Sequence, residues 1–349
     1  MKMHRYDEKS VVYSNLNPME DVHFWIRGLR SKGLATDILR EHHGVRDRSI
    51  KSRSVAISRH AETAVNLLEQ GFEGPIETSF LPLYYGMLNL AKIYIICSDQ
   101  YSLLRKKENK KHGATSLPHW GNPRNFLKDK ILLFSKGTIS IFYKTITGKE
   151  ITNKNIIELG EVYPFIADIS HEYSSLYKTE YPLQFCGLEI IKDESNGHFV
   201  RLTLEGDIHR NSNHSQRNQF LTNFNKTKDN RYETEKIQGD FEKVSTELKN
   251  KLKRFLLYEE VLRDLRGKEI VITSVPISAK RVLFPEELPI LIAFFHLSTI
   301  VRYHPELLFE LKDSPEWGMI QTLSRHGAYR FLTLFWSYIQ QKSVFIHKK

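Results

Sequence analysis

Residues 81–93 read L-P-L-Y-Y-G-M-L-N-L-A-K-I, and this stretch decides the fold of the first half of the chain. Apolar side chains recur three or four residues apart along it and just after it, at Leu83, Met87, Leu90, Ala91 and Tyr94. Such spacing predicts a helix with one buried face. Pro82 would stand near the start of that helix, where its missing N–H costs little. The apolar pattern fades at Asp99, so we expect the helix to end before Gly113.

A second Leu-Pro stretch, L-P-I-L-I-A-F-F-H-L-S-T-I at residues 288–300, can be laid over the first without a gap. Leu, Pro, Leu and Ile coincide at the two ends of the window. Apolar helices that begin with Leu-Pro coincide often by chance, so internal duplication is the minor alternative. We expect two core helices of one helical body, adjacent in space.

The rest of the chain mixes strand and helix patterns. Residues 130–144 predict two short strands around a turn at 135–137, and residues 183–192 and 198–206 predict a hairpin. The periodicity of residues 241–265 and 318–341 favours helices. The expected fold class is therefore α+β, predominantly helical, with a helical body and a smaller mixed α/β middle region.

Four regions follow from these patterns. Residues 1–55 form a basic N-terminal segment, and residues 56–125 a helical region. Residues 126–240 form a mixed strand and loop region, in which the polar stretch 207–239 predicts a long surface loop or mobile insertion. Residues 241–349 form a C-terminal helical region expected to pack back on residues 56–125.

The composition favours polyanion partners. Lys and Arg number 51 against 41 Asp and Glu in 349 residues, a formal charge of +10. Nucleic acid is the first partner class that this balance suggests, and an anionic membrane surface the second. The longest apolar stretches, 80–97 and 288–301, are interrupted by polar residues or proline, so we predict no transmembrane helix and no membrane partner.

The sequence lacks the motifs of exported proteins and of metal- or cofactor-binding proteins. The N-terminus lacks the apolar segment of a signal peptide. Cys97 and Cys186 lie among apolar neighbours, which is typical of reduced structural thiols. Both observations predict a cytoplasmic protein. No Cys/His pairs fall at zinc spacing, and no acidic calcium loop occurs. Phosphate-binding, dinucleotide and serine-esterase glycine motifs are also missing, so we expect no metal and no cofactor.

Two basic runs are candidate nucleic-acid contacts. One contains Arg46, Arg48, Lys51 and Arg53, and the other contains Lys106, Lys107, Lys110 and Lys111. Both would suit phosphate groups. The alternative is a solvated linker for the first run and a solvated helix end for the second, whose positive charge suits the helix dipole.

The run P-L-Y-Y-G-M-L-N-L-A-K, the later H-G, and H-L-S-T-I-V-R-Y-H-P-E far down the chain resemble the YaaC-like proteins of bacteria. That family has no settled activity to carry over. The helix followed by H-G is similar to the arrangement in HEPN domains, helical units often found in bacterial defence and toxin systems. This resemblance makes residues 56–125 HEPN-like.

Active HEPN ribonucleases place a His after an Arg and four to six further residues, and Arg105 and His112 fit that spacing. Metal-free RNA cleavage needs a base for the 2′-hydroxyl and positive charge for the transition state, which His and Arg supply. Against this, about three such pairs are expected by chance in this chain, and Arg53 with His60 is another. Lys106 also stands where active members usually carry a small polar residue. The solvated helix end therefore remains the alternative.

Further polar side chains lie on the two Leu-Pro helices. Candidates for a cleft between them are Tyr84, Tyr85, Asn89, His296, Arg302 and His304. Arg302 and His304 could face the H-G loop across that cleft. The alternative is that these groups are satisfied within the core or at a helix end, because an unpaired buried polar group costs about 1–3 kcal/mol.

The leading functional hypothesis is an intracellular bacterial protein that binds nucleic acid or a nucleic-acid-handling partner. The resemblance adds a place in a host-defence assembly, as a homodimer or in a hetero-complex. One alternative is a HEPN-like, metal-independent ribonuclease that uses Arg105 and His112. A second alternative is a non-catalytic interaction scaffold.

Overall fold

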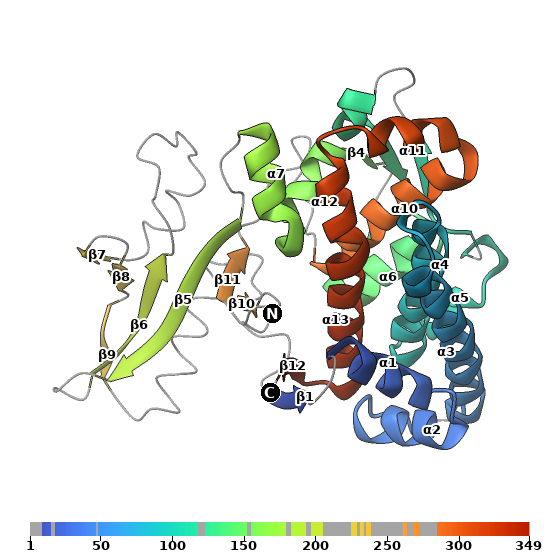
Figure 1. The fold of residues 1–349 in the computed structure, drawn as a ribbon. Coiled ribbons are helices and arrows are strands. Elements are labelled where there is room, and N and C mark those ends of the chain that lie inside the picture. The colour runs from blue at the N-terminus through green and yellow to red at the C-terminus, as the bar shows by residue number, and fades with distance from the viewer. Residues whose placement is uncertain are drawn as a thin grey trace.

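The computed structural model describes residues 9–14, 18–46, 48–109, 111–117, 123–151, 155–178, 183–192, 197–204, 225–228, 231–233, 235–238, 261–263, 269–272 and 285–348. A helical body occupies one side of the molecule and a run of antiparallel strands the other (Figure 1). The predicted class, α+β and predominantly helical, is confirmed. The α-helices are α1 (Pro18–Gly28), α2 (Lys32–Glu41), α3 (Ile50–Glu73), α4 (Ile76–Cys97), α5 (Tyr101–Leu104), α6 (Thr138–Thr147), α7 (Ser170–Tyr177), α10 (Glu287–Tyr303), α11 (Pro305–Lys312), α12 (Trp317–Thr322) and α13 (Ala328–Gln340).

Short turns of helix join these elements. They are η1 (Lys107–Asn109), η2 (Pro123–Lys128), η3 (Leu159–Glu161), η4 (Tyr163–Phe165), η5 (Ala167–Ile169) and the π-helical turn η6 (Leu323–Gly327). The π turn joins α12 to α13, so residues 317–340 form one nearly continuous helical segment. The helix predicted at 318–341 is therefore present, with an irregular turn in its first half.

Helix α4 is the centre of the helical body. It packs against α3, α6, α10 and α13, and most of its side chains are buried. Among the described residues it alone is long and apolar enough to cross a membrane, but 78% of its apolar window is buried inside the protein. Such burial is typical of a core helix.

The proline of α4 stands inside the helix rather than near its start, contrary to the prediction. The helix begins six residues earlier than Pro82, at Ile76, because the N–H groups of Thr78 and Ser79 both donate to the carbonyl of Pro75 at 3.0 Å. Pro75 sets an extended entry, and the apolar run that follows is then buried as a helix.

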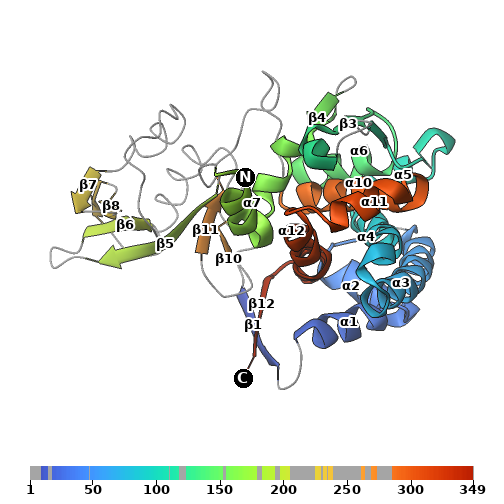
Figure 2. The same ribbon diagram turned by 45° about the horizontal axis from the view of Figure 1, so that its top comes forward.

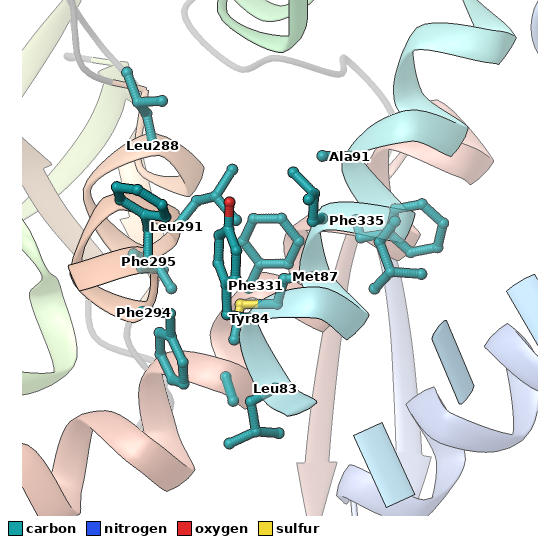
Figure 3. Packing of buried hydrophobic residues seen from close by; sticks show 14 of the residues in the cluster. Leu83, Tyr84, Met87, Ala91, Leu288, Leu291, Phe294, Phe295, Phe331 and Phe335 are labelled. Atoms are coloured by element: carbon teal, nitrogen blue, oxygen red, sulfur yellow. The ribbon is translucent and has the colours of Figure 1, made fainter. Parts of the chain in front are cut away.

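The two Leu-Pro helices pack against each other, as predicted. The rings of Phe80 and Phe294 lie 5.7 Å apart, and those of Tyr84 and Phe295 lie 5.4 Å apart. Figure 3 shows side chains of α4 and α10 meeting, with Phe331 and Phe335 of α13 beside them. The similar stretches 81–93 and 288–300 thus belong to two neighbouring helices of a shared core.

A buried ion pair connects α10 with α13. Arg330 donates from Nε and Nη2 to the two carboxylate oxygens of Glu286, at 2.8 and 3.0 Å. Glu286 directly precedes α10, so this pair sets how the C-terminal helix meets the start of α10.

A small antiparallel sheet lies beside the helical body. Its strands are β2 (Ala114–Leu117), β3 (Lys130–Leu133) and β4 (Asn155–Glu158), with β3 in the centre. Residues 138–144, predicted to be the second of two short strands, belong to α6 instead. Their Thr, Ile, Phe and Tyr content favours strands, but Gly137 and Gly148 cap the segment with positive φ values at both ends. Capping and burial here override strand propensity.

A larger sheet has the strand order β10-β11-β5-β6-β8-β7, with β9 on β6. Its strands are β5 (Leu183–Lys192), β6 (Gly197–Leu204), β7 (Asn225–Lys228), β8 (Arg231–Glu233), β9 (Ile237–Gln238), β10 (Val261–Arg263) and β11 (Glu269–Ile272). The β5–β6 hairpin is confirmed, with Ile190 opposite Val200. The surface loop predicted at 207–239 and the helix predicted at 241–265 are both wrong where the structure describes them. Strands β7, β8 and β9 lie in the first range, and β10 lies in the second. The remainder of both ranges lies outside the described residues.

The ends of the described chain pair with each other. Strand β1 (Lys9–Ser14) runs parallel to β12 (Ser343–Lys348), and Figure 2 shows the pair below the body, beside α1. This pairing places the start of the chain next to the end of α13, at some distance from the loop that follows α5 (Figure 1).

Candidate functional site

The loop that carries His112 is held against the first turn of α6. The N–H groups of Thr138 and Ile139 donate to the carbonyls of Lys111 and His112, both at 2.9 Å. The Asn109 side chain accepts a further bond from the Gly137 N–H at 3.1 Å. The first N–H groups of a helix have no partner within the helix, so this loop supplies acceptors for them. The backbone of His112 is fixed as a result.

Gly137 makes this contact sterically feasible. Its φ is +114°, and a Cβ there would lie 2.5 Å from Gly113 Cα. We expect Gly137→Ala to destabilise the fold by about 2–4 kcal/mol, because it adds backbone strain to a clash between two main chains. Gly148→Ala, at the other end of α6, is the matched control. Gly148 has φ +70° but open space around it, so about 1 kcal/mol of strain is expected. Urea unfolding measures both, and equal losses would contradict the steric argument.

The His112 ring packs among aromatic side chains from α4 and α10. Its Nδ1 lies 2.8 Å from the Tyr84 hydroxyl. The ring stacks on Tyr84, meets the ring of Tyr85 edge-on and lies next to Phe295. The hydrogen bond at Nδ1 is the one that the described residues make to this ring. The imidazole is therefore oriented through Nδ1.

Two cations act on this imidazole. The pKa of His112 is lowered from its ordinary value, first by burial and then by the charges of Lys92 and Arg302. Arg302 donates from Nη1 to the Tyr85 hydroxyl at 3.1 Å. We call Tyr84, Tyr85, Lys92, His112, Phe295 and Arg302 the His112 cluster.

Lys92 is the unexpected member of the cluster. Its side chain is half-buried, and burial lowers its pKa. Among the described residues, no carboxylate lies within ion-pair distance of Lys92 or of Arg302. A cation that is partly removed from water without a counter-charge is costly, and this cost falls on Lys92, because Arg302 is exposed. The cluster therefore has the electrostatics of an anion-binding site.

Helical spacing brings the cluster together. Tyr85, Asn89 and Lys92 lie on one face of α4, and Phe295 and Arg302 lie seven residues apart on one face of α10. Asn89 supports this face, because its amide donates to the Tyr85 carbonyl and its oxygen lies 2.8 Å from His60 Nδ1. Sequence reasoning named Tyr85, Asn89 and Arg302 but missed Lys92. Lys92 could have been found from the sequence, because it is a lone lysine in an apolar helix, two turns after Tyr85.

Arg105 does not belong to the cluster. It is exposed at the C-terminal end of α5 and is not among the charges that shift the pKa of His112. The neighbouring Lys106, Lys107 and Lys111 are exposed too, and Lys110 lies outside the described residues. The arginine beside His112 in space is Arg302, which comes from the other end of the chain.

The N-terminal basic run divides in two. Arg46, Arg48 and Lys51 are exposed. Arg53 instead donates to the carbonyls of Ile96 and Ser98, at 2.8 and 2.5 Å, and lies over the ring of Tyr101. It satisfies carbonyls at the end of α4, so its role is structural.

His296 and His304 lie in other surroundings. His296 is fully buried, with Nδ1 2.9 Å from Ser116 Oγ and Nε2 3.1 Å from Asp129 Oδ2. These are the residue types of a catalytic triad, but the Asp129 contact lacks the direction of a hydrogen bond. We interpret the group as an anchor between α10 and the small sheet. His304 is partly buried, and its Nδ1 lies 3.7 Å from Oε1 of the exposed Glu306.

Comparison with known proteins identifies the family. The sequence model of YaaC-like proteins matches residues 28–339. The chain belongs to the YaaC-like family. The match includes both Leu-Pro helices and every residue of the His112 cluster. No curated protein and no solved structure matches this YaaC-like protein.

Proposed function

We propose that this YaaC-like protein binds nucleic acid, or a partner that carries it, through the phosphate-binding character of the His112 cluster. The observation that supports this most is the gathering of Lys92, Arg302 and His112 without a described carboxylate partner. The exposed Lys106, Lys107 and Lys111, close to His112 along the chain, would continue the positive surface. Phosphate contacts of this kind dominate nucleic-acid affinity.

In this proposal the protein is a cytoplasmic protein of bacteria and a subunit of a host-defence assembly. This setting rests on the similarity of the helix and H-G loop to HEPN domains. A homodimer or hetero-complex would fit this setting, and a non-catalytic interaction scaffold remains the alternative if no nucleic acid binds.

The test is the salt dependence of RNA affinity. We expect Lys92→Met and Arg302→Gln each to weaken binding about 5- to 10-fold and to reduce the slope of log affinity against log salt by about 1. Fluorescence anisotropy with a labelled RNA over a range of salt concentrations measures both quantities.

These substitutions separate loss of binding from loss of fold. Lys92→Met removes a half-buried charge while keeping the shape of the side chain, so it should not lower the melting temperature. Arg325→Gln, at an exposed arginine of η6 outside the cluster, is the matched control and should leave affinity unchanged. Wild-type affinity and slope in both cluster variants would contradict the proposal.

A second candidate function is metal-independent RNA cleavage by the same cluster. Burial and two cations lower the pKa of His112, so the neutral imidazole needed for a general base is favoured near pH 7. Its Nε2 would take the proton of a 2′-hydroxyl, whose oxygen attacks the adjacent phosphorus, while Lys92 and Arg302 offset the growing negative charge. Water, or His112 of a second copy, would return a proton to the departing 5′-oxygen. In this hypothesis Arg302 takes the role that the sequence pattern gave to Arg105.

A further inference from the structure

The aromatic side chain next to Arg302 adds a recognition element to the cluster. Tyr303 ends α10, and its side chain is 59% exposed. The Arg302 guanidinium carbon lies 5.0 Å from the centre of the Tyr303 ring. The same guanidinium donates to the Tyr85 hydroxyl. Arg302 thus connects the His112 cluster with an aromatic ring at the surface.

Tyr303 differs from the other exposed aromatic side chains of the described residues in its surroundings, because a cation lies over its ring. A large aromatic ring gains most when both faces leave water. Arg302 lies over the Tyr303 ring, but more than half of the side chain remains open to solvent. An arginine that lies over a tyrosine ring, next to positive charge with no carboxylate partner among the described residues, is the combination that holds a base and its phosphate in single-stranded nucleic acid.

We propose that the ligand of the His112 cluster is single-stranded nucleic acid, with one base stacked on Tyr303 and the adjoining phosphate held by Arg302 and Lys92. This inference rests on the proposed nucleic-acid function and adds the strand form and the stacking residue. A duplex keeps its bases stacked within the helix and offers none to Tyr303, so it binds through its phosphates alone.

The experiment compares two strands of equal charge. An oligonucleotide of about ten nucleotides and an otherwise identical strand with abasic sites are titrated into the protein in the presence of EDTA. The wild type is expected to bind the base-bearing strand about tenfold more tightly than the abasic strand. Tyr303→Ala should abolish that preference, whereas Tyr303→Phe should retain it because the ring remains.

The controls keep the two proposals distinguishable. Phe309→Ala removes another exposed aromatic side chain, 68% exposed on α11, and should leave the preference intact. Arg302→Gln should weaken binding of both strands, since it removes a phosphate contact. Equal affinity of the wild type for both strands would overturn the stacking proposal and leave phosphate binding standing. Absence of binding to either strand would overturn both.

Discussion

Replacing Arg330 with alanine is expected to destabilise the protein by about 3–5 kcal/mol, the largest loss from a single side chain that the structure supports. Arg330 is 6% exposed and Glu286 2% exposed, and two hydrogen bonds join them. Removal of the arginine leaves the Glu286 carboxylate in the core with no guanidinium opposite it. Loss of stability of this size is a large fraction of what a domain has.

The surroundings of Glu286 increase the penalty. Burial raises its pKa above the ordinary value of 4.5, Arg330 lowers it, and Asp168 and Glu287 raise it again. In the alanine variant burial, Asp168 and Glu287 still raise the pKa of Glu286, and Arg330 no longer lowers it. The folded state then binds a proton more tightly than the unfolded state, so the deficit should shrink as the pH falls from neutral toward 4.5.

Urea unfolding at pH 7 and pH 5 measures the deficit of Arg330→Ala. A Glu286→Leu/Arg330→Met double variant should recover most of the loss, because it removes both charges and keeps apolar volume. Arg325→Ala, an exposed arginine one turn and a half earlier, should stay within about 0.5 kcal/mol of wild type. A deficit below about 1 kcal/mol in Arg330→Ala would show that water or another group compensates Glu286.

The helical body could be predicted because its signal is local. The spacing of Leu83, Met87 and Leu90 depends only on the helical repeat, and shared apolar character was enough to pair α4 with α10. Residues 138–144 were predicted wrongly for a non-local reason. Their strand-like composition yields to Gly137, Gly148 and acceptors supplied by a loop some twenty-five residues earlier.

In the candidate site, too, residues with a local signal could be predicted and contacts between distant residues were harder to predict. Tyr84, Tyr85 and Arg302 could be named from sequence because each is a polar group on an otherwise apolar helix. For the partner of His112 the sequence offered two hypotheses. The motif spacing points to Arg105, whereas a cleft between the two Leu-Pro helices would place Arg302 opposite the H-G loop, and the folded chain brings Arg302 across from α10. Proximity between residues 190 positions apart depends on how α4 and α10 pack, which spacing along the chain does not encode.

If the cluster is catalytic, His112→Ala is expected to lower the rate of RNA cleavage in EDTA by about 100- to 10,000-fold, the range lost with a general base. Purified protein and mixed cellular RNA, resolved on one gel, report cleavage and retention together. RNA retention should fall much less than cleavage, because Lys92 and Arg302 still hold phosphate. Arg105→Ala is the matched control, and it should keep its activity because Arg105 is exposed outside the cluster.

The pH profile separates a base at His112 from a merely positional role. The base must be unprotonated, and the pKa of His112 is depressed below its ordinary 6.5, so the rate should hold steady down to about pH 6.5 and fall only below it. Arg302→Gln removes one of the charges that depress this pKa, and so should move the fall in rate toward higher pH. Intact RNA with wild-type protein that retains it would remove the catalytic candidate and leave a binding protein. Equal cleavage by wild type and His112→Ala would show that the cleavage comes from another part of the protein or from a contaminating nuclease.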